Sequence, residues 1–502
     1  MSKQQPNSSL DATVAKAAAE VETLDVAPVN ARGNRQLYAS RKRIHPKRAR
    51  GDFRQVKWAV MIVTLGIYYL APWLRWDRGP NAPDQAILID LPARRFYFFF
   101  IEIWPQEVYY ITGLLILAAI GLFLFTALLG RVWCGYSCPQ TVWVDLFLVV
   151  ERFFEGDRNA RIKLDRTPWT LDKWRRKIAK HAVWLAIGVL TGGAWVFYFA
   201  DAPTLLSQLV HFDAPFPAYL FIGIFTATTY VLGGFAREQV CTYMCPWPRI
   251  QSALIDQDSL LVTYDRSRGE PRGPHRRGES WEGRGHCVNC NQCVAACPMG
   301  IDIRDGLQLE CIQCALCIDA CNEVMAKVDL PRGLISYTTI ANQKRRAQGE
   351  PDRLRILRPR VLLYTAMLIL VSGIMLYAFV TRPVSGLNVL PDRNPLYVTL
   401  SDGGIRNGYT LKVINKLREE RAFRLAVVGL PDPVTITGLG IRTTSGTPVI
   451  DVPPDALRAV RIFVAVPRTA LADKSTRFDF VLTDLASGGS TRHTTQFNGP
   501  EP

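Results

Sequence analysis

Apolar residues gather in long runs over the first three quarters of the chain. About 20 apolar residues are enough to cross a bilayer as a helix. Five segments meet this condition: 56–75, 109–130, 182–200, 217–236 and 361–380. The aromatic run at 96–104 is shorter and contains Glu102, so we interpret it as an interfacial or re-entrant piece. The pattern predicts an α-helical transmembrane bundle of about five spans.

The pattern changes after residue 383 to short alternating segments separated by Gly, Pro, Asp and Asn. These segments are "LYVTL", "YTLKVINKL", "FRLAVVGL", "AVRIFVAVP" and "RFDFVLTDL". A period of two with regular turn signals predicts a β-sandwich, here immunoglobulin-like and covering 383–502. This region has no nucleophile–base pair and no metal-ligand cluster, which favours a binding or docking role.

The same patterns divide the chain into five parts. We expect a disordered basic tail (1–50), a four-span membrane region (51–250), a soluble domain (251–350), a fifth membrane helix (355–382) and the sandwich (383–502). A cleaved signal peptide would carry its apolar stretch nearer the start, so the pattern indicates an uncleaved, multi-domain membrane protein.

The formal charge of +16 could suggest nucleic-acid binding, but the basic residues flank the membrane-length runs. They concentrate at 41–50, 158–180 and 343–360, whereas the loop at 201–216 has no Lys or Arg. Positive charge marks the cytoplasmic side of a membrane protein. We therefore expect the amino terminus and the 237–360 region in the cytoplasm, and the carboxy-terminal domain on the opposite side, the periplasm of a Gram-negative bacterium.

The 12 cysteines fall into two kinds of motif, and none follows Cys321. This distribution is unlike a secreted disulfide framework and indicates reduced or metal-bound thiolates. Eight of them form "CVNCNQCVAACP" (287–298) and "CIQCALCIDAC" (311–321). Both follow Cys-x-x-Cys-x-x-Cys-x-x-x-Cys, in which three thiolates hold one cubane and the fourth reaches a second.

The spacing gives a crossed assignment of ligands to two [4Fe–4S] clusters. One cluster takes Cys287, Cys290, Cys293 and Cys321, and the other takes Cys311, Cys314, Cys317 and Cys297. Zinc is the alternative for paired Cys-x-x-Cys motifs, but two full four-cysteine runs favour iron–sulfur clusters. The linker between them has few strand signals, so we predict a helical ferredoxin-type insert facing the cytoplasm.

The other four cysteines form two Cys-x-x-x-Cys-Pro stretches, each after a membrane-length run. These are "WCGYSCPQT" (133–141) and "VCTYMCPWP" (240–248), preceded by Arg131 and Arg237. The repeat suggests a duplicated hairpin that brings both pairs together. On a helix, residues i and i+4 share a face, so each pair would present two thiols to one side.

Four interpretations of these pairs remain open: small buried apolar side chains, a soft-metal site for Cu(I), a dithiol–disulfide station, or ligands of a further iron–sulfur centre. Haem is disfavoured because no histidine lies within a predicted span. His286 adjoins Cys287, and we interpret it as a solvated side chain.

The chain resembles the cytochrome c oxidase accessory proteins of the CcoG/FixG/RdxA type over about residues 35–500. The resemblance is carried by "GRVWCGYSCPQTVWVDLFLVVER" (130–152), "VCTYMCPWPRIQSA" (240–253), the double cluster motif (287–322) and "NGYTLKVINK" (407–416). It implies a bacterial inner-membrane protein that assists assembly of a cbb3-type oxidase by reducing Cu(II) to Cu(I).

The resemblance assigns roles and partners residue by residue. The eight ferredoxin cysteines become cluster ligands, and Cys134, Cys138, Cys241 and Cys245 become the copper-reducing or copper-holding thiols. The implied partners are oxidase assembly factors or copper chaperones, together with an electron donor that the sequence does not identify. Two alternatives compete: a quinol-linked membrane ferredoxin that feeds a periplasmic enzyme, and a non-enzymatic assembly scaffold.

Overall fold

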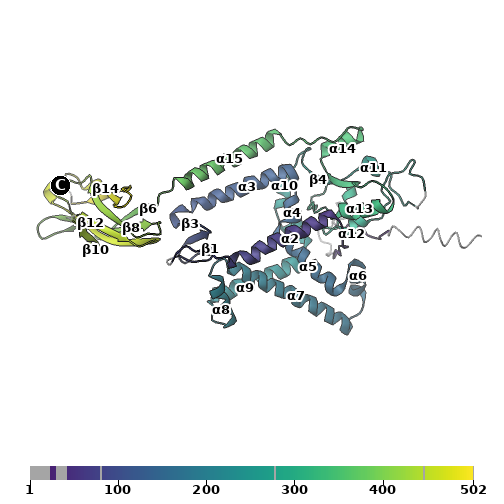
Figure 1. The fold of residues 1–502 in the computed structure, drawn as a ribbon, viewed down its shortest axis with the longest axis horizontal. Helices are drawn as coiled ribbons and strands as arrows, with labels where there is room; N and C mark the ends of the chain where they lie inside the picture. The colour runs from purple at the N-terminus through teal and green to yellow at the C-terminus, as the bar shows by residue number, and fades with distance from the viewer. Residues whose placement is uncertain (1–22, 30–41, 80–81, 276–278, 445–446, 501–502) are drawn as a thin grey trace, which may run out of the picture. The chain divides into compact units, whose positions relative to one another are not determined.

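The computed structural model describes residues 23–29, 42–79, 82–275, 279–444 and 447–500. The chain divides into two compact units. One unit comprises Met1–Arg75 with Gln85–Met375, and the other comprises Trp76–Asp84 with Leu376–Pro502. Figure 1 shows that the first is mainly helical and the second is built of strands.

The helical part of the chain contains both long apolar helices and short helices around the cysteine motifs. Its elements are α2 (Asp52–Leu70), α3 (Tyr109–Leu129), α4 (Val132–Tyr136), α5 (Pro139–Glu155), α6 (Arg158–Arg166), α7 (Leu171–Val196), α8 (Ala202–Val210), α9 (Phe216–Thr229), η5 (Tyr230–Ala236), η6 (Val240–Met244), α10 (Trp247–Leu254) and α15 (Pro359–Val380). The segments η5 and η6 are π-helical, a wider winding that occurs often at functional sites.

Within the described residues, four helices are long and apolar enough to cross a membrane: Asp52–Trp73, Pro105–Leu129, Phe216–Ala236 and Pro359–Val380. They coincide with four of the five predicted spans. The remaining prediction, 182–200, falls on α7, which begins with basic residues and ends at Val196. Its apolar part is therefore shorter than about 20 residues, and α7 does not meet the length and composition of a membrane span.

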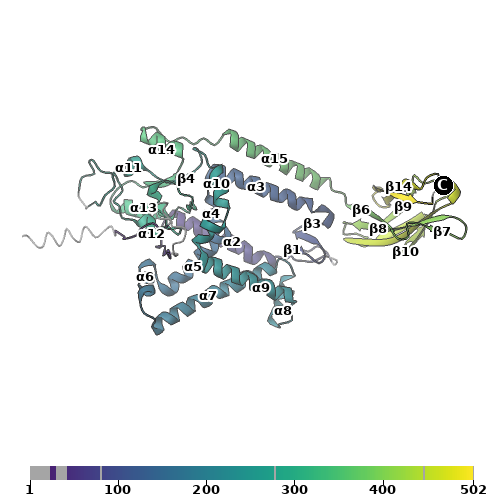
Figure 2. The same cartoon turned by 180° about the vertical axis from the view of Figure 1, so that it is seen from behind.

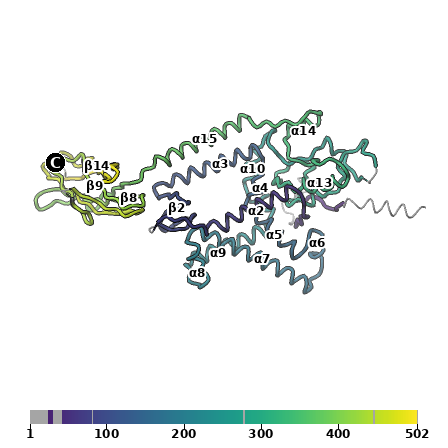
Figure 3. The backbone as a smooth tube through the Cα atoms, in the orientation of Figure 1, coloured from purple at the N-terminus to yellow at the C-terminus, as the bar shows by residue number. Residues whose placement is uncertain are grey.

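Helix α7 packs along α9, and the smooth trace in Figure 3 shows the two running side by side. Gly188 and Gly192 of α7 lie where the two helices are in close contact. A Cβ atom on Gly192 would lie 2.7 Å from the carbonyl oxygen of Ile222, and one on Gly188 would lie 3.2 Å from that of Thr226. Small residues four apart allow two membrane helices to approach backbone to backbone.

The aromatic run at 96–104, which we interpret from sequence as an interfacial or re-entrant piece, forms part of a three-stranded antiparallel sheet. Strand β1 (Ile87–Asp90) pairs with β2 (Arg95–Phe98), which pairs with β3 (Ile101–Ile103). The charged residue in this run is satisfied across the sheet, because Arg95 Nη1 lies 2.9 Å from Glu102 Oε1.

The cysteine-rich region is the predicted helical ferredoxin insert. It contains α11 (Arg266–Gly269), α12 (Gln292–Ala296), η7 (Ile303–Asp305), α13 (Leu316–Lys327) and α14 (Ile340–Ala347), with β4 (Leu261–Tyr264) paired antiparallel to β5 (Ile335–Thr338). Its core includes Val262, Met325, Leu334 and Ile335.

Part of the amino-terminal segment that was predicted to be disordered packs on this insert. The backbone N–H of Leu24 donates to the carbonyl of Cys290 at 3.1 Å, and that of Lys47 donates to Ala295 at 2.8 Å. Leu24 is buried. The prediction is therefore wrong for 23–29 and 42–50, while 1–22 and 30–41 lie outside the described residues.

The carboxy-terminal unit is an antiparallel β-sandwich, as the alternating pattern predicts. Its strands are β6 (Ser385–Pro391), β7 (Val398–Thr399), β8 (Ile405–Asn415), β9 (Arg421–Val428), β10 (Thr435–Leu439), β11 (Arg442–Thr444), β12 (Thr447–Val452), β13 (Ala456–Val466), β14 (Ser475–Asp484) and β15 (Ser490–Asn498). One sheet has the order β10-β13-β8-β6, with β7 on β8, and the other has the order β11-β12-β9-β14-β15.

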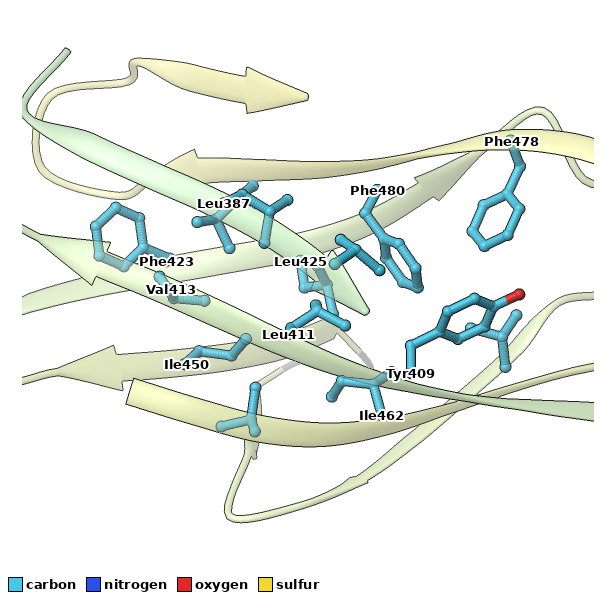
Figure 4. Packing of buried hydrophobic residues seen from close by; sticks show 14 of the residues in the cluster. Leu387, Tyr409, Leu411, Val413, Phe423, Leu425, Ile450, Ile462, Phe478 and Phe480 are labelled. Carbon is cyan, nitrogen blue, oxygen red and sulfur yellow. The ribbon is translucent and has the colours of Figure 1, made fainter. Parts of the chain in front are cut away.

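The core of the sandwich comes from alternate residues of both sheets (Figure 4). Tyr409, Leu411 and Val413 point inward from β8, and Phe478 and Phe480 point inward from β14. The ring of Tyr409 packs edge-on against Phe480, and its hydroxyl donates to the carbonyl of Gln496 at 2.8 Å. Burial of alternate side chains is what the period of two requires.

Candidate functional site

The two ferredoxin motifs fold in the same way. In the first, Asn289 and Asn291 have φ of 54° and 56°, and in the second the equivalent Gln313 and Ala315 have φ of 55° and 61°. A short helix follows each loop, α12 in the first and α13 in the second. Residues other than glycine seldom adopt this left-handed conformation. Its occurrence at matching positions shows that the backbones of the two loops follow the same path.

The eight cysteines of these motifs form two groups, each completed by the last cysteine of the other motif. Cys321 interacts electrostatically with Cys287, Cys290 and Cys293, and we refer to these four as the Cys287 set. Cys297 interacts with Cys311 and Cys314, and Cys317 interacts with all three; these four are the Cys311 set. This grouping matches the crossed assignment made from spacing; that the thiols ligate clusters stays a prediction.

The chemistry of both sets fits a cationic iron–sulfur core. Burial raises the pKa of Cys293 and of Cys297 to about 12, and that of Cys311 to about 11. Buried thiolates are costly without adjacent positive charge, which iron supplies. Backbone N–H groups of Met299 and Ile301 also donate to the sulfur of Cys297, as expected around a cluster ligand.

No set of ligands for a single metal ion stands out in the described part of the chain. Among the described residues, no three His, Cys, Asp or Glu side chains converge closely enough to hold one metal ion. A zinc ion requires four sulfurs at about 2.3 Å from one point. By this criterion neither the ferredoxin cysteines nor the cysteines of the two Cys-Pro stretches surround a single ion.

The Cys-Pro stretches do not place two thiols on one helical face. Cys134 lies in α4, but Cys138 is extended, with φ −59° and ψ 128°, and α5 starts at Pro139. Cys241 lies in η6, and Cys245 is likewise extended before Pro246. The residue before proline is driven out of the helical region by the proline ring. Each pair therefore spans a break between two helices, which corrects the i, i+4 prediction.

The two pairs nevertheless come together, as the duplication predicts. Burial and then the thiol of Cys138 raise the pKa of Cys241 to about 12, with further contributions from Cys134 and Cys245. Burial raises the pKa of Cys134 to about 12, and its Sγ donates to Gln251 Oε1 at 3.2 Å. We call Cys134, Cys138, Cys241 and Cys245 the four-thiol site.

The four-thiol site adjoins the Cys311 set. Cys134 and Cys241 pack against the same apolar cluster as Cys297 and Cys311. Gly135, between the first two thiols, lies directly on the second ferredoxin loop, since a Cβ there would be 2.7 Å from the carbonyl oxygen of Ile312. Helix α4 contacts α5, which follows the first Cys-Pro stretch (Figure 2).

The arginine before each Cys-Pro stretch is buried but has different surroundings. Arg131 donates to carbonyl groups of the second ferredoxin loop. Arg237 instead forms a 2.6 Å ion pair with Glu151 of α5, which also pairs with Arg161 at 2.8 Å and Arg43 at 2.9 Å. These cations hold the pKa of Glu151 at about 2 against the effect of burial.

Sequence reasoning missed Gln251, Gln313 and Glu151 as parts of this region. Glu151 and Gln251 are fully buried, and Gln313 is nearly so. Their only sequence signal is a polar residue within an apolar or cysteine-rich stretch. The pairing of Arg131 and Arg237 with the Cys-Pro repeat did mark both arginines, although not their partners.

Comparisons with known proteins agree with this arrangement. Residues 111–155 match the model of a 4Fe-4S binding domain, and 236–340 match that of a 4Fe-4S dicluster domain. Residues 375–500 match a model described as an immunoglobulin-like fold at the C-terminus of FixG, an oxidoreductase. The first model includes Cys134 and Cys138, and the second includes Cys241, Cys245 and both ferredoxin motifs.

Three curated proteins are similar over nearly their full length. The nitrogen fixation protein FixG of Rhizobium meliloti is 54% identical, covering 97% of this chain and 98% of its own. Protein RdxB of Cereibacter sphaeroides is 52% identical over 92% of this chain and 97% of its own, and protein RdxA of the same organism is 51% identical over 88% and 94%. The chain therefore belongs to the FixG/RdxA/RdxB family of membrane iron–sulfur proteins.

Proposed function

We propose that this protein carries electrons to the four-thiol site and there reduces Cu(II) to Cu(I), in support of the assembly of a cbb3-type cytochrome c oxidase. The observation that carries the proposal is the packing of Cys134 and Cys241 against the same apolar cluster as Cys297 and Cys311. Redox centres and soft-metal ligands thus share one core. The copper ion is the substrate, and each Cu(II) takes up one electron.

The two ferredoxin sets supply the electrons. When bound, each [4Fe–4S] cluster gives up one electron as it passes from its reduced to its oxidised form. Cys317 of the Cys311 set interacts with Cys293 of the Cys287 set, so the sets are neighbours. Their positions support an order from the Cys287 set to the Cys311 set and then to the four-thiol site.

The residues of the four-thiol site suit the product better than the substrate. Thiolates are preferred ligands of Cu(I), whereas Cu(II) favours nitrogen and oxygen. Gln251 orients Cys134 because its Oε1 accepts a hydrogen bond from the thiol, with 3.2 Å between Sγ and Oε1, and Arg131 favours the thiolate form of Cys134 electrostatically. Copper binding would displace the thiol protons, because thiolate is the ligand form.

Loop charges support the inner, cytoplasmic membrane as the location, with the ferredoxin insert in the cytoplasm and the sandwich in the periplasm. Termini on opposite sides require an odd number of crossings. We propose that α7 supplies the additional crossing, because Gly188 and Gly192 place it against α9. The sandwich would then contact oxidase assembly factors or copper chaperones, and a cytoplasmic donor would reduce the clusters.

The test is an anaerobic single-turnover reaction on the full-length, cluster-loaded protein in detergent. The clusters are reduced with dithionite, the excess is removed, and Cu(II) is added with a Cu(I)-specific chelator. We expect about one Cu(I) per electron stored in wild type and in the control Ser137→Ala, which alters the same loop without removing a thiol. The variant with all four thiols changed to Ser should give little Cu(I); equal rates in both would exclude the proposed role.

A second candidate is that the four thiols hold a further [4Fe–4S] cluster. The match of 111–155 to a 4Fe-4S binding domain favours it. Iron analysis separates the two possibilities, since two clusters contain about eight iron atoms per chain and three contain about twelve. Loss of about four iron atoms on replacing the four thiols would support the second candidate.

A further inference from the structure

The side chain of Arg131 joins three parts of the site. Its Nη1 donates to the carbonyls of Leu309 and Cys311, and its Nη2 donates to the carbonyl of Pro248 at 2.8 Å. Its backbone N–H donates to Gln313 Oε1 at 2.8 Å. Arg131 thus connects the end of the second apolar span to the second ferredoxin loop and to the helix after the second Cys-Pro stretch.

The charge of Arg131 is buried without a carboxylate partner. The residue is only 5% exposed, and its Nε has no hydrogen-bond partner. Every hydrogen-bond acceptor of Arg131 in the described parts of the chain is an uncharged oxygen. An isolated buried charge is strongly unfavourable, so a negative group is expected next to it.

Two other buried arginines of the region show the contrast. Arg237, which occupies the matching place before the second Cys-Pro stretch, pairs with Glu151 at 2.6 Å. Arg304, which lies beside the Cys287 set, is neutralised by Asp302 at 2.6 Å. Arg304 therefore contributes little net charge to its surroundings, and Arg237 shares its carboxylate with Arg161 and Arg43, whereas Arg131 has no carboxylate partner in the described part of the chain.

The negative group expected next to Arg131 would be the Cys311 set, whose sulfurs would carry negative charge when a cluster is bound. Arg131 interacts electrostatically with both Cys311 and Cys134, and donates to the carbonyl of Cys311. A [4Fe–4S] cluster with four thiolates is anionic and becomes more so on reduction. A fixed cation beside it stabilises the reduced form and raises its potential, because net charge near the cluster is one determinant of potential.

We propose that Arg131 is a positioning residue that raises the reduction potential of the cluster held by the Cys311 set and ties that cluster to the four-thiol site. This inference extends the proposed function, and its statement about delivery of electrons to copper rests on that proposal. The electrostatic part does not depend on copper. The Cys287 set, with its neutralised arginine, would hold the cluster of lower potential, and electrons would run from it to the Cys311 set.

The test compares midpoint potentials in cluster-loaded, full-length Arg131→Gln, Arg131→Lys and Arg237→Lys, the last as the matched control. Iron and sulfide content are measured first, and the potentials are then obtained by an EPR-monitored redox titration without copper. We expect one of the two potentials to fall in Arg131→Gln by at least the ~59 mV that corresponds to a tenfold change for one electron. Both potentials should stay unchanged in the two Lys variants.

Unchanged potentials in Arg131→Gln with intact clusters would overturn the proposal. If Arg131→Gln instead loses one cluster, the iron content of the two variants is compared. A full iron content in Arg131→Lys supports a requirement for positive charge at residue 131, and an equal loss of iron in both variants contradicts it. Because no step uses copper, a shifted potential together with absent Cu(I) formation in wild type would reject the proposed copper reduction while leaving the role of Arg131 in place.

Discussion

The carboxylate of Asp319 in α13 accepts a 2.7 Å hydrogen bond from the backbone N–H of Arg54 in α2. It also accepts one from Phe53 at 3.3 Å. The first turn of a helix has backbone N–H groups without intrahelical partners, and these are normally satisfied by a residue close in sequence. Here the capping residue, Asp319, lies more than 260 residues later in the chain. The ferredoxin insert therefore caps the amino-terminal end of α2.

Removing this cap should destabilise the insert and α2 together. We expect Asp319→Ala to lower the free energy of unfolding by about 1–2 kcal/mol, because two helix N–H groups lose their acceptor. The control is Glu323→Ala on the same helix, whose exposed pair with Lys327 should contribute less than about 0.5 kcal/mol. Denaturant titration in detergent measures both, and equal effects would contradict a capping role.

Gly135 should be essential for seating the first Cys-Pro stretch on the second ferredoxin loop. A Cβ atom there would lie 2.7 Å from the Ile312 oxygen and 3.0 Å from the backbone N of Cys314. Because the obstruction is backbone, Gly135→Ala should cost about 1–3 kcal/mol and reduce the bound iron. The control is Gly121→Ala in α3, where a Cβ meets nothing within 4 Å. Full iron content in Gly135→Ala would show that the loop can move away.

The local features of this protein could be predicted from sequence, whereas its long-range contacts could not. The ferredoxin spacing predicted the two groups of cysteines because a cluster imposes its geometry on a short loop. The sandwich was predicted from five alternating segments, which correspond to β7, β8, β9, β13 and β14. The strands β6, β10, β11, β12 and β15 were missed, and most of β15, "STRHTTQF", is polar on both faces. An edge strand with little burial carries no alternating signal.

The ion pairs between segments of the helical region have no sequence pattern from which they could be predicted. Glu151 pairs with Arg43 and Arg237 from distant segments and with Arg161 from the next helix, and a sequence shows only scattered charges. The proline that follows Cys138 and Cys245 predicts a break in the helix at these residues. The i, i+4 spacing of the cysteines instead predicts a continuous helix. In this case the restriction that proline places on the preceding residue outweighed helix periodicity.

Two adjacent glycines of α7 provide a test of the packing between α7 and α9. Gly192→Ala would bring a Cβ to 2.7 Å from the Ile222 oxygen, whereas Gly193→Ala would meet nothing within 4 Å. We expect Gly192→Ala to lower the free energy of unfolding by about 1–3 kcal/mol. Gly193→Ala should be neutral or stabilising by up to about 1 kcal/mol, since alanine favours helix more than glycine does. Similar melting temperatures for the two variants would refute the close approach.

His45 should make stability depend on pH. It lies in the ordered part of the amino-terminal segment, with Nε2 3.4 Å from Asp165 Oδ2. Burial, followed by the cations Arg161 and Arg43, lowers its pKa from 6.5 to about 4, and Asp165 and Glu151 only partly oppose this. The folded protein therefore holds His45 neutral over a range in which the unfolded chain protonates it.

The sign of the effect follows from linkage. A group whose pKa is lower in the folded state contributes stability above the unfolded pKa, here 6.5, and that contribution is lost as pH falls toward 4. Between pH 7.5 and 5 the melting temperature of wild type should thus fall more steeply than that of His45→Gln, which cannot gain this proton. Other titrating groups are common to both proteins and cancel in the difference. Parallel curves, with cluster absorbance constant over the range, would show that His45 is protonated equally in both states.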